Sequence, residues 1–340
     1  MSFFRKFSHP ILAICFFAIA NAASDDDTYI TPNAGPRVED GADVFFNADL
    51  IVWEATQMGF SFAESERLVN DAGKGYIYYP KFQFDPGFQL GFGLNLGHDG
   101  WDTLVNYTWF HPQTKETSLV DDPQEPNLFE SGFDLLLSSA KLYFLYQLDV
   151  IDFEIGRNYK ISQDLTLRPF IGLKTAWNRE FVRQYMTSFD DNLYIIKTRQ
   201  RSFEVGGRGG MNMHYLINSN WSLFSNTAFS VLSNTCKNHT LTMYNPSVLD
   251  EETISDFSDK QVFIQPVAEL TIGLQWDIWS DSQEYHLGVS AAYDFQYWNN
   301  NLYTRVPIII DETPPSIKQN VLKSGDLSIQ GFNLKFRFDF

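Results

Sequence analysis

The sequence predicts an all-β protein, a single transmembrane antiparallel β-barrel. Three observations support this prediction: an N-terminal export signal, apolar–polar alternation along most of the chain, and a last strand that ends on an aromatic residue. Aromatic residues make up 16% of the chain, which a barrel can turn toward lipid and the membrane interfaces. The mean hydropathy of −0.23 is too polar for a bundle of membrane helices.

The N-terminus has the features of a signal peptide. Arg5 and Lys6 precede an apolar run, Ile11–Ala20, and Ala20-Asn21-Ala22 matches a small-x-small cleavage pattern. Ten apolar residues are too few for a helix that crosses about 30 Å of hydrocarbon, and no later segment has eighteen consecutive apolar residues. We therefore predict that residues 1–22 are a cleaved signal peptide and that the mature chain is exported.

The mature chain is acidic and nearly free of cysteine. The net charge of −17 becomes −19 when Arg5 and Lys6 leave with the signal peptide, which argues against a nucleic-acid partner. Cys236 is then the only cysteine, so an intramolecular disulfide is excluded, and an inert thiol is favoured over an intermolecular bond. Residues 23–42, acidic and rich in turn formers, are predicted to be a periplasmic lead-in to a barrel over residues 43–340.

Period-two alternation indicates the strands. In Gly87–Leu96 the large apolar residues share one face and glycine or polar residues the other, and a similar run extends over Val262–Trp279. Short connections are expected at 98–100, 218–220 and 280–282, and long ones at 112–132, 234–260 and 299–325. This asymmetry is typical of short periplasmic turns and long external loops. We expect roughly twelve to fourteen strands, in an even number.

The last strand is the most specific element. It presents a lipid-facing stripe that ends on the terminal aromatic residue and contains Phe332, Phe336, Phe338 and Phe340. We expect the barrel assembly machinery of the outer membrane to recognise this strand. On a soluble protein such an edge would be an aggregation hazard. A core strand of a secreted β-sandwich is the alternative, and it predicts solubility without detergent.

Several segments spread over almost the whole mature chain carry a family resemblance: Phe46–Ala55, Lys81–Gly93, His98–Asp102, Leu165–Leu173, Tyr285–Leu287, Phe295–Trp298 and Leu327–Phe340. In these segments the chain resembles the pore-forming major-outer-membrane-protein-like barrels of legionellae and chlamydia-related bacteria. The resemblance implies a porin-like outer-membrane protein with no catalytic residues to carry over.

Sequence motifs for catalysis or for metal and cofactor binding are weak, so we expect that the protein is not an enzyme and binds no cofactor. The six histidines lack ligand spacing, and no G-x-S-x-G is present. Gly206–Gly210 lacks the P-loop pattern and is better explained by small lumen-facing residues or a strand corner. Two acidic groups in predicted loops, at 121–125 and 250–259, suggest weak divalent-cation binding, although solvated loops are the favoured interpretation.

The lumen is where function is expected. The alternation places charges of both signs on the inner face, and these are the candidate pore-lining residues: Asp152, Glu154, Arg168, Lys174, Glu269, Asp277, Asp294, Lys335 and Arg337. Charged residues on the inner face can select hydrated solutes, or they can form salt bridges that stabilise the barrel. We expect a channel for passive diffusion of small hydrophilic solutes.

Three alternatives remain: an adhesive or structural barrel whose long external loops bind host or neighbouring proteins, a barrel enzyme, and the secreted sandwich. Expected partners are outer-membrane lipid and the assembly machinery. A homo-oligomer stays open, with the weak apolar face at Leu223–Val231 as a candidate contact.

Overall fold

The computed structural model describes residues 43–59, 61–66, 75–96, 100–113, 117–120, 128–129, 137–245, 252–280, 284–310 and 316–340. The predicted signal peptide, residues 1–22, and lead-in, residues 23–42, lie outside this part. Fifteen strands are described: β1 Val44–Gln57, β2 Ala63–Glu66, β3 Gly75–Tyr78, β4 Phe84–Asn95, β5 Trp101–Phe110, β6 Thr117–Val120, β7 Leu128–Phe129, β8 Leu137–Arg157, β9 Tyr159–Lys160, β10 Leu165–Ser188, β11 Leu193–Leu216, β12 Trp221–Asn245, β13 Glu252–Trp279, β14 His286–Ile310 and β15 Ser316–Asp339.

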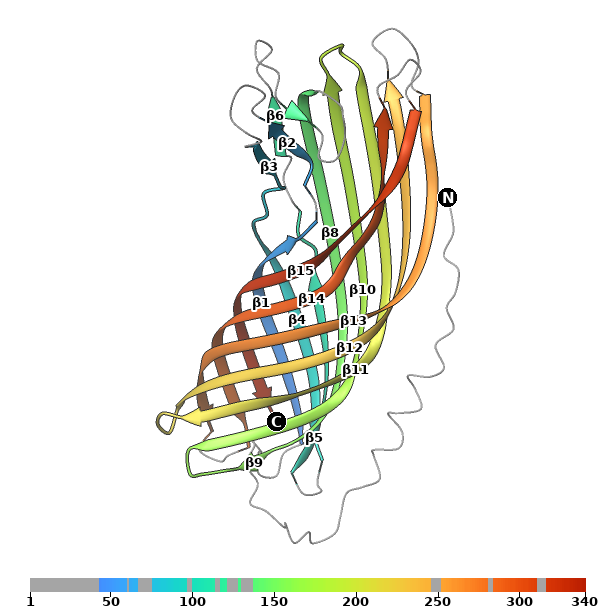
Figure 1. Ribbon diagram of the computed structural model, residues 1–340. Helices are drawn as coiled ribbons and strands as arrows, with labels where there is room; N and C mark the ends of the chain where they lie inside the picture. Colours follow the sequence, from blue (N-terminus) through green and yellow to red (C-terminus); the bar gives the residue numbers. More distant parts are fainter. Residues whose placement is uncertain are drawn as a thin grey trace, which may run out of the picture.

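Ten of these strands form a closed antiparallel ring (Figure 1). The order around the ring is β8, β5, β4, β1, β15, β14, β13, β12, β11 and β10, and pairing of β10 with β8 closes it. The predicted fold class is confirmed, and the even number holds. No helix in the described part of the chain is long and apolar enough to cross a membrane.

The strand count of twelve to fourteen was too high. Six ring strands, β10 to β15, are 24–28 residues long, far beyond the 9–11 residues that one crossing needs. They take up chain that the prediction had assigned to extra strands and loops. β6 pairs only with the first residues of β8, and the two residues of β9 pair only with β10.

Two of the three predicted long loops were also wrong. The segment 234–260 continues β12 to Asn245 and starts β13 at Glu252, and the segment 299–325 is largely β14 and β15. The backbone ladder continues through both hairpins, for example from Lys237 to Lys260. In the β12–β13 hairpin, residues 234–240 are largely polar on both faces, so the alternation that marks a membrane strand is absent there. Figure 1 shows β8 and β10–β12 rising well above the end of β1.

The two ends of the barrel differ in their connections. The start of β1 and the end of β15 lie together, because Val44 and Phe340 exchange backbone hydrogen bonds of 3.3 and 3.1 Å. The same end holds the β11–β12 turn, where the Asn218 side chain accepts hydrogen bonds from the backbone of Asn220 and Trp221. Short turns at the end that carries both strand termini are typical of a periplasmic side.

The wall is apolar outside and mixed inside. Outward side chains include large exposed apolar groups on successive strands, such as Leu50, Phe229 and Ile264, whose exposed fractions are 54%, 55% and 69%. A soluble protein rarely exposes a continuous apolar surface of this kind, whereas a membrane barrel requires it.

Candidate functional site: the barrel interior

All nine predicted lining residues face the interior. Five are buried: Asp152, Glu154, Arg168, Lys174 and Asp294. The other four, which are partly exposed or border the inner cavities, are Glu269, Asp277, Lys335 and Arg337. They do not form one ring. The structure divides them among three groups at different heights, and it adds charged partners that the prediction had not named.

The largest group is a charged girdle of seven side chains: Asp102, Asp152, Glu154, Arg168, Lys174, Arg208 and Glu269. Arg168 donates to Asp102 at 2.8 Å and to Glu154 at 3.2 Å. Arg208 donates to Glu154 at 3.3 Å and to Glu269 at 2.6 Å. Each guanidinium therefore joins at least two carboxylates, which ties β5, β8, β10, β11 and β13 together across the lumen.

Lys174 completes the girdle. Its ammonium lies 2.9 Å from carboxylate oxygens of both Asp152 and Glu269, and Asp152 lies 3.6 Å from Arg208. Paired charges of both signs keep the cost of burial low, because each carboxylate has a cationic partner. Unlike a surface ion pair, this arrangement is held by the rigid wall on every side.

One glycine makes room for a guanidinium group, and another allows two neighbouring strands to approach closely. A Cβ at Gly156 would lie 2.5 Å from the Arg168 guanidinium carbon. Gly206 faces inward two residues before Arg208, and a Cβ there would lie 1.9 Å from the Val231 carbonyl oxygen. The aromatic ring of Phe170 lies 5.6 Å from both guanidinium carbons, so it separates the two cations favourably.

A second group surrounds Asp294. Its carboxylate accepts hydrogen bonds from Trp53 at 3.1 Å, Asn333 at 3.1 Å and Thr271 at 2.6 Å. Asp49 lies beside it, 4.0 Å from the Lys335 ammonium. A buried carboxylate with three donors is held in one orientation, so this group fixes β1, β13, β14 and β15 to one another.

A third group lies near the end with the short turns. The His286 ring is held between two carboxylates, with Nδ1 2.7 Å from Asp339 and Nε2 2.9 Å from Asp277. Arg337 also donates to Asp339, at 2.9 Å. His286 is therefore a hydrogen-bonded histidine on the inner face of the barrel.

Two adjoining cavities occupy the polar part of the interior. One, of about 150 Å³, is lined by girdle residues and by Asp49, Asp294 and Asn333. The other, of about 420 Å³, lies toward the short turns and is lined by residues that include Asp277, His286 and Arg337. They share six lining residues: Leu104, Asn212, Phe224, Asn226, Ser290 and Lys335. The two cavities are therefore neighbours in the polar part of the lumen.

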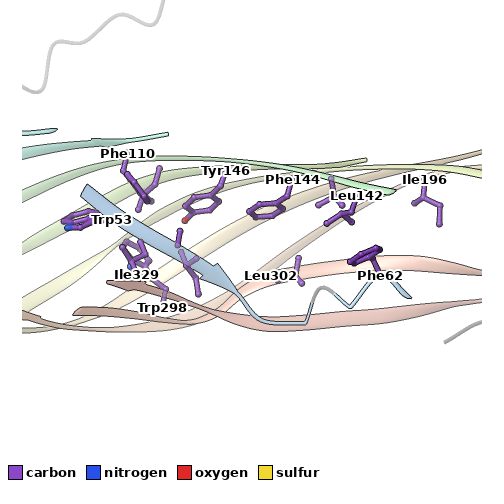
Figure 2. Close-up of a cluster of buried hydrophobic side chains, with 14 of the residues drawn as sticks. Trp53, Phe62, Phe110, Leu142, Phe144, Tyr146, Ile196, Trp298, Leu302 and Ile329 are labelled. Atoms are coloured by element: carbon purple, nitrogen blue, oxygen red, sulfur yellow. The ribbon is translucent and has the colours of Figure 1, made fainter. Parts of the chain in front are cut away.

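Beyond the girdle the interior is divided: β10–β14 contribute buried polar side chains such as Glu180, Glu204 and Asn301, and an apolar cluster lies beside them. We call this cluster the apolar plug: Trp53, Phe62, Phe110, Leu142, Phe144, Tyr146, Trp298 and Leu302. Figure 2 shows these side chains pointing toward one another from opposite walls. Trp53 and Phe110 meet edge to face at 5.5 Å, and the Lys174 ammonium lies 5.5 Å from the Trp298 ring. The plug therefore rests directly on the charged girdle.

The C-terminal stripe faces outward. Phe332, Phe336, Phe338 and Phe340 are 62%, 46%, 41% and 38% exposed. Phe338 lies 5.5 Å from Phe340, and Tyr285 stacks on Phe338 at 6.0 Å. The stripe is the outer face of β15, which pairs with β1 in the ring. Its recognition by the assembly machinery stays a prediction.

The comparison with protein families decides the chain's relationship. Residues 41–340 match the family described as Legionella pneumophila major outer membrane protein precursor. The chain belongs to this family. The resemblance predicted from the sequence is confirmed, and the protein is an outer-membrane protein. No curated protein matches the chain.

Solved structures similar to this barrel are distant in sequence. OmpT, the outer membrane protease of Escherichia coli, is 8% identical with a TM-score of 0.42, over 92% of this chain and 99% of that one. The Pseudomonas putida toluene transporter TodX is 11% identical with a TM-score of 0.31, over 92% and 93%. A Pseudomonas aeruginosa FadL homologue is 8% identical with a TM-score of 0.26, over 87% and 90%. At these scores the similarities carry no argument about cargo or chemistry.

The sequence had not indicated several members of the site. Asp102 and Arg208 are central to the girdle, yet neither was among the candidates. Arg208 had a signal, since it stands alone between two pairs of glycines in a strand whose inner face needs space. Cys236 is fully buried and faces the interior, where its thiol lies 3.7 Å from Asn238. The acidic positions 121–125, 250 and 251 lie outside the described residues.

Proposed function

We propose that the protein is an outer-membrane channel for small hydrophilic solutes, closed at rest by the apolar plug. The observation that carries this proposal is the pair of adjoining polar cavities with fixed charges of both signs. Hydrated solutes interact favourably with such walls, and opposed charges orient them. A purely structural barrel has no need of polar cavities inside a membrane wall.

The plug determines how such a channel works. A ring of ten strands is only slightly wider than the eight that side chains can fill, so a few aromatic groups close it. Passage then requires the plug residues to move, and an apolar constriction of this kind resists water until it widens. The proposal therefore predicts small, infrequent conductance steps rather than a permanently open pore.

Conductance in planar bilayers tests the proposal. The variants Phe110→Leu and Trp298→Leu thin the plug but keep apolar side chains in place. The matched control is Phe229→Leu, which removes an aromatic ring from the lipid face instead. We expect the two plug variants to open more often than wild type and the control to behave like wild type. If no folded variant gives channel steps, the channel proposal is wrong.

The filled interior favours one second candidate, an adhesive or structural barrel. The hairpin of β10 and β11 projects far beyond β1 and ends in a short turn at residues 189–192. A rigid hairpin raised above the membrane suits contact with another protein. Shortening this hairpin by equal numbers of residues from both strands should then abolish attachment to cells and leave conductance unchanged.

The proposal assigns no catalytic residue. A serine-reactive probe that labels a single residue of the folded barrel would contradict it.

A further inference from the structure

A row of cations crosses the outer face of four adjacent strands. Arg179 of β10 is paired in register with Arg201 of β11, Arg201 with Lys237 of β12, and Lys237 with Lys260 of β13. All four side chains are exposed and point away from the lumen. We call them the cation row. Strands lie about 4.8 Å apart, so the row spans about 14 Å.

Without a bound anion, the cation row destabilises the folded protein. Like charges directly opposite each other on neighbouring strands repel and destabilise a sheet. Within the part of the chain that the structure describes, none of the four forms an ion pair. The chain has 42 acidic residues against 25 basic ones, so four adjacent cations run against its composition and call for an anion from outside.

The neighbouring rows extend the positive surface on one side only. The next outward positions in register hold one cation, in the order Phe181, Arg199, His239 and Ser258, and the row after them holds two, in the order Arg183, Lys197, Leu241 and Asp256. Asp256 is the acidic exception, and it lies 2.8 Å from the His239 ring. In the opposite direction the next positions in register are Trp177, Phe203, Thr235 and Val262. Trp177 contacts Phe203 with ring centroids 5.8 Å apart. The cation row therefore stands at the rim of the apolar wall.

Its height matches a lipid headgroup layer. Two exposed aromatic residues near the short turns, Tyr215 of β11 and Trp276 of β13, serve as reference points. The cation row lies fourteen residues from Tyr215 along β11 and sixteen residues from Trp276 along β13. At about 3.3 Å per residue and a tilt of about 45°, this is about 33–37 Å along the membrane normal. The apolar band of such barrels is about 25 Å tall, so the row lies beyond the hydrocarbon on the side opposite the termini.

We propose that the cation row binds the phosphate groups of an anionic lipid of the outer leaflet. Phosphate oxygens accept charge-assisted hydrogen bonds, and the two arginines can donate in bidentate geometry. The first carbons of the acyl chains of the same lipid then pack on Trp177, Phe203 and Val262, which lie two residues closer to the apolar band. Charge and apolar contact are thus arranged in the order that a phospholipid or phosphorylated glycolipid presents them. The inference does not depend on the channel function.

The test compares two vesicle types and two fourfold variants. Wild type is folded into phosphatidylcholine vesicles with and without lipid A, and its thermal midpoint and retained lipid are measured by gel mobility and native mass spectrometry. The neutral variant is Arg179→Gln, Arg201→Gln, Lys237→Gln and Lys260→Gln. The matched control keeps every charge with Arg179→Lys, Arg201→Lys, Lys237→Arg and Lys260→Arg.

We expect the difference in thermal stability between the neutral variant and wild type to change sign between the two vesicle types. In phosphatidylcholine the neutral variant should be at least as stable as wild type, because repulsion within the row is relieved. With lipid A, wild type and the control should gain stability and retain lipid, and the neutral variant should not. Affinity should fall about fivefold for each cation removed. If the neutral variant gains as much from lipid A as wild type, or if inorganic phosphate alone stabilises wild type equally, the proposal is overturned.

Discussion

Removal of Arg208 tests whether the girdle stabilises the barrel. Its guanidinium is the partner of Glu269 at 2.6 Å, Glu154 at 3.3 Å and Asp152 at 3.6 Å. The substitution Arg208→Met keeps most of the side-chain volume and deletes the charge. Glu269 then retains only Lys174, at 2.9 Å. The girdle goes from three cations and four anions to two cations and four anions.

The size of the effect follows from this imbalance. Breaking a buried ion pair by removing one partner costs about 3–5 kcal/mol, since the remaining charge is left uncompensated. The Arg208 and Glu269 side chains are 10% and 15% exposed and border a cavity, so water can hydrate the carboxylates partly. We therefore expect Arg208→Met to lower the free energy of unfolding by about 3 kcal/mol, the lower end of this range. This corresponds to about a hundredfold change in the unfolding equilibrium constant.

The assay is urea unfolding in lipid vesicles, followed by tryptophan fluorescence and heat-dependent gel mobility. The double variant Arg208→Met, Glu269→Gln serves as control, because removing both partners leaves no orphaned charge. It should recover at least half of the loss, which a double-mutant cycle measures directly. A loss below about 0.5 kcal/mol for the single variant, or simple additivity in the double variant, would refute the reasoning.

Three further predictions concern separate parts of the wall. Gly206→Ala should lower the folded yield strongly, because its Cβ would meet the Val231 carbonyl oxygen, whereas Gly207→Ala should have no effect, since nothing lies within 4 Å of a Cβ there; heat-dependent gel mobility measures both. Cys236 should react with maleimide only after the barrel is unfolded, because it is fully buried. Phe338→Ser should lower the amount of assembled protein in the outer membrane, and unchanged amounts would show that the stripe is not needed for assembly.

The orientation of side chains was predictable because it depends on a local rule. Successive residues of a strand face opposite sides, so the parity of a position relative to the outward Phe332 or Leu90 gives its face. For this reason all nine charged candidates face the interior, including Asp152 and Lys335, although their strands were only partly delimited. Neither the strand count nor the loops affect that assignment.

Contacts across the lumen were not predictable in the same way. Asp102 and Arg168 are sixty-six residues apart, and they meet only because β5 and β10 both flank β8 in one register. Such a meeting depends on the number of strands and on the stagger of the ring. Since the count was overestimated, no correct pairing of girdle residues could follow from the sequence.

The plug, in contrast, has a signal in a single strand. From Leu142 to Leu148, β8 is largely apolar on both faces, with Phe144 and Tyr146 directed inward and Tyr143 and Leu145 outward. A strand with lipid on one side and water on the other would not place aromatic rings on its inner face. Beyond Val150 the inner positions become Asp152 and Glu154. The change along β8 thus marks where its inner face passes from the apolar plug to the charged girdle, and plug and girdle also meet where the Lys174 ammonium lies 5.5 Å from the Trp298 ring.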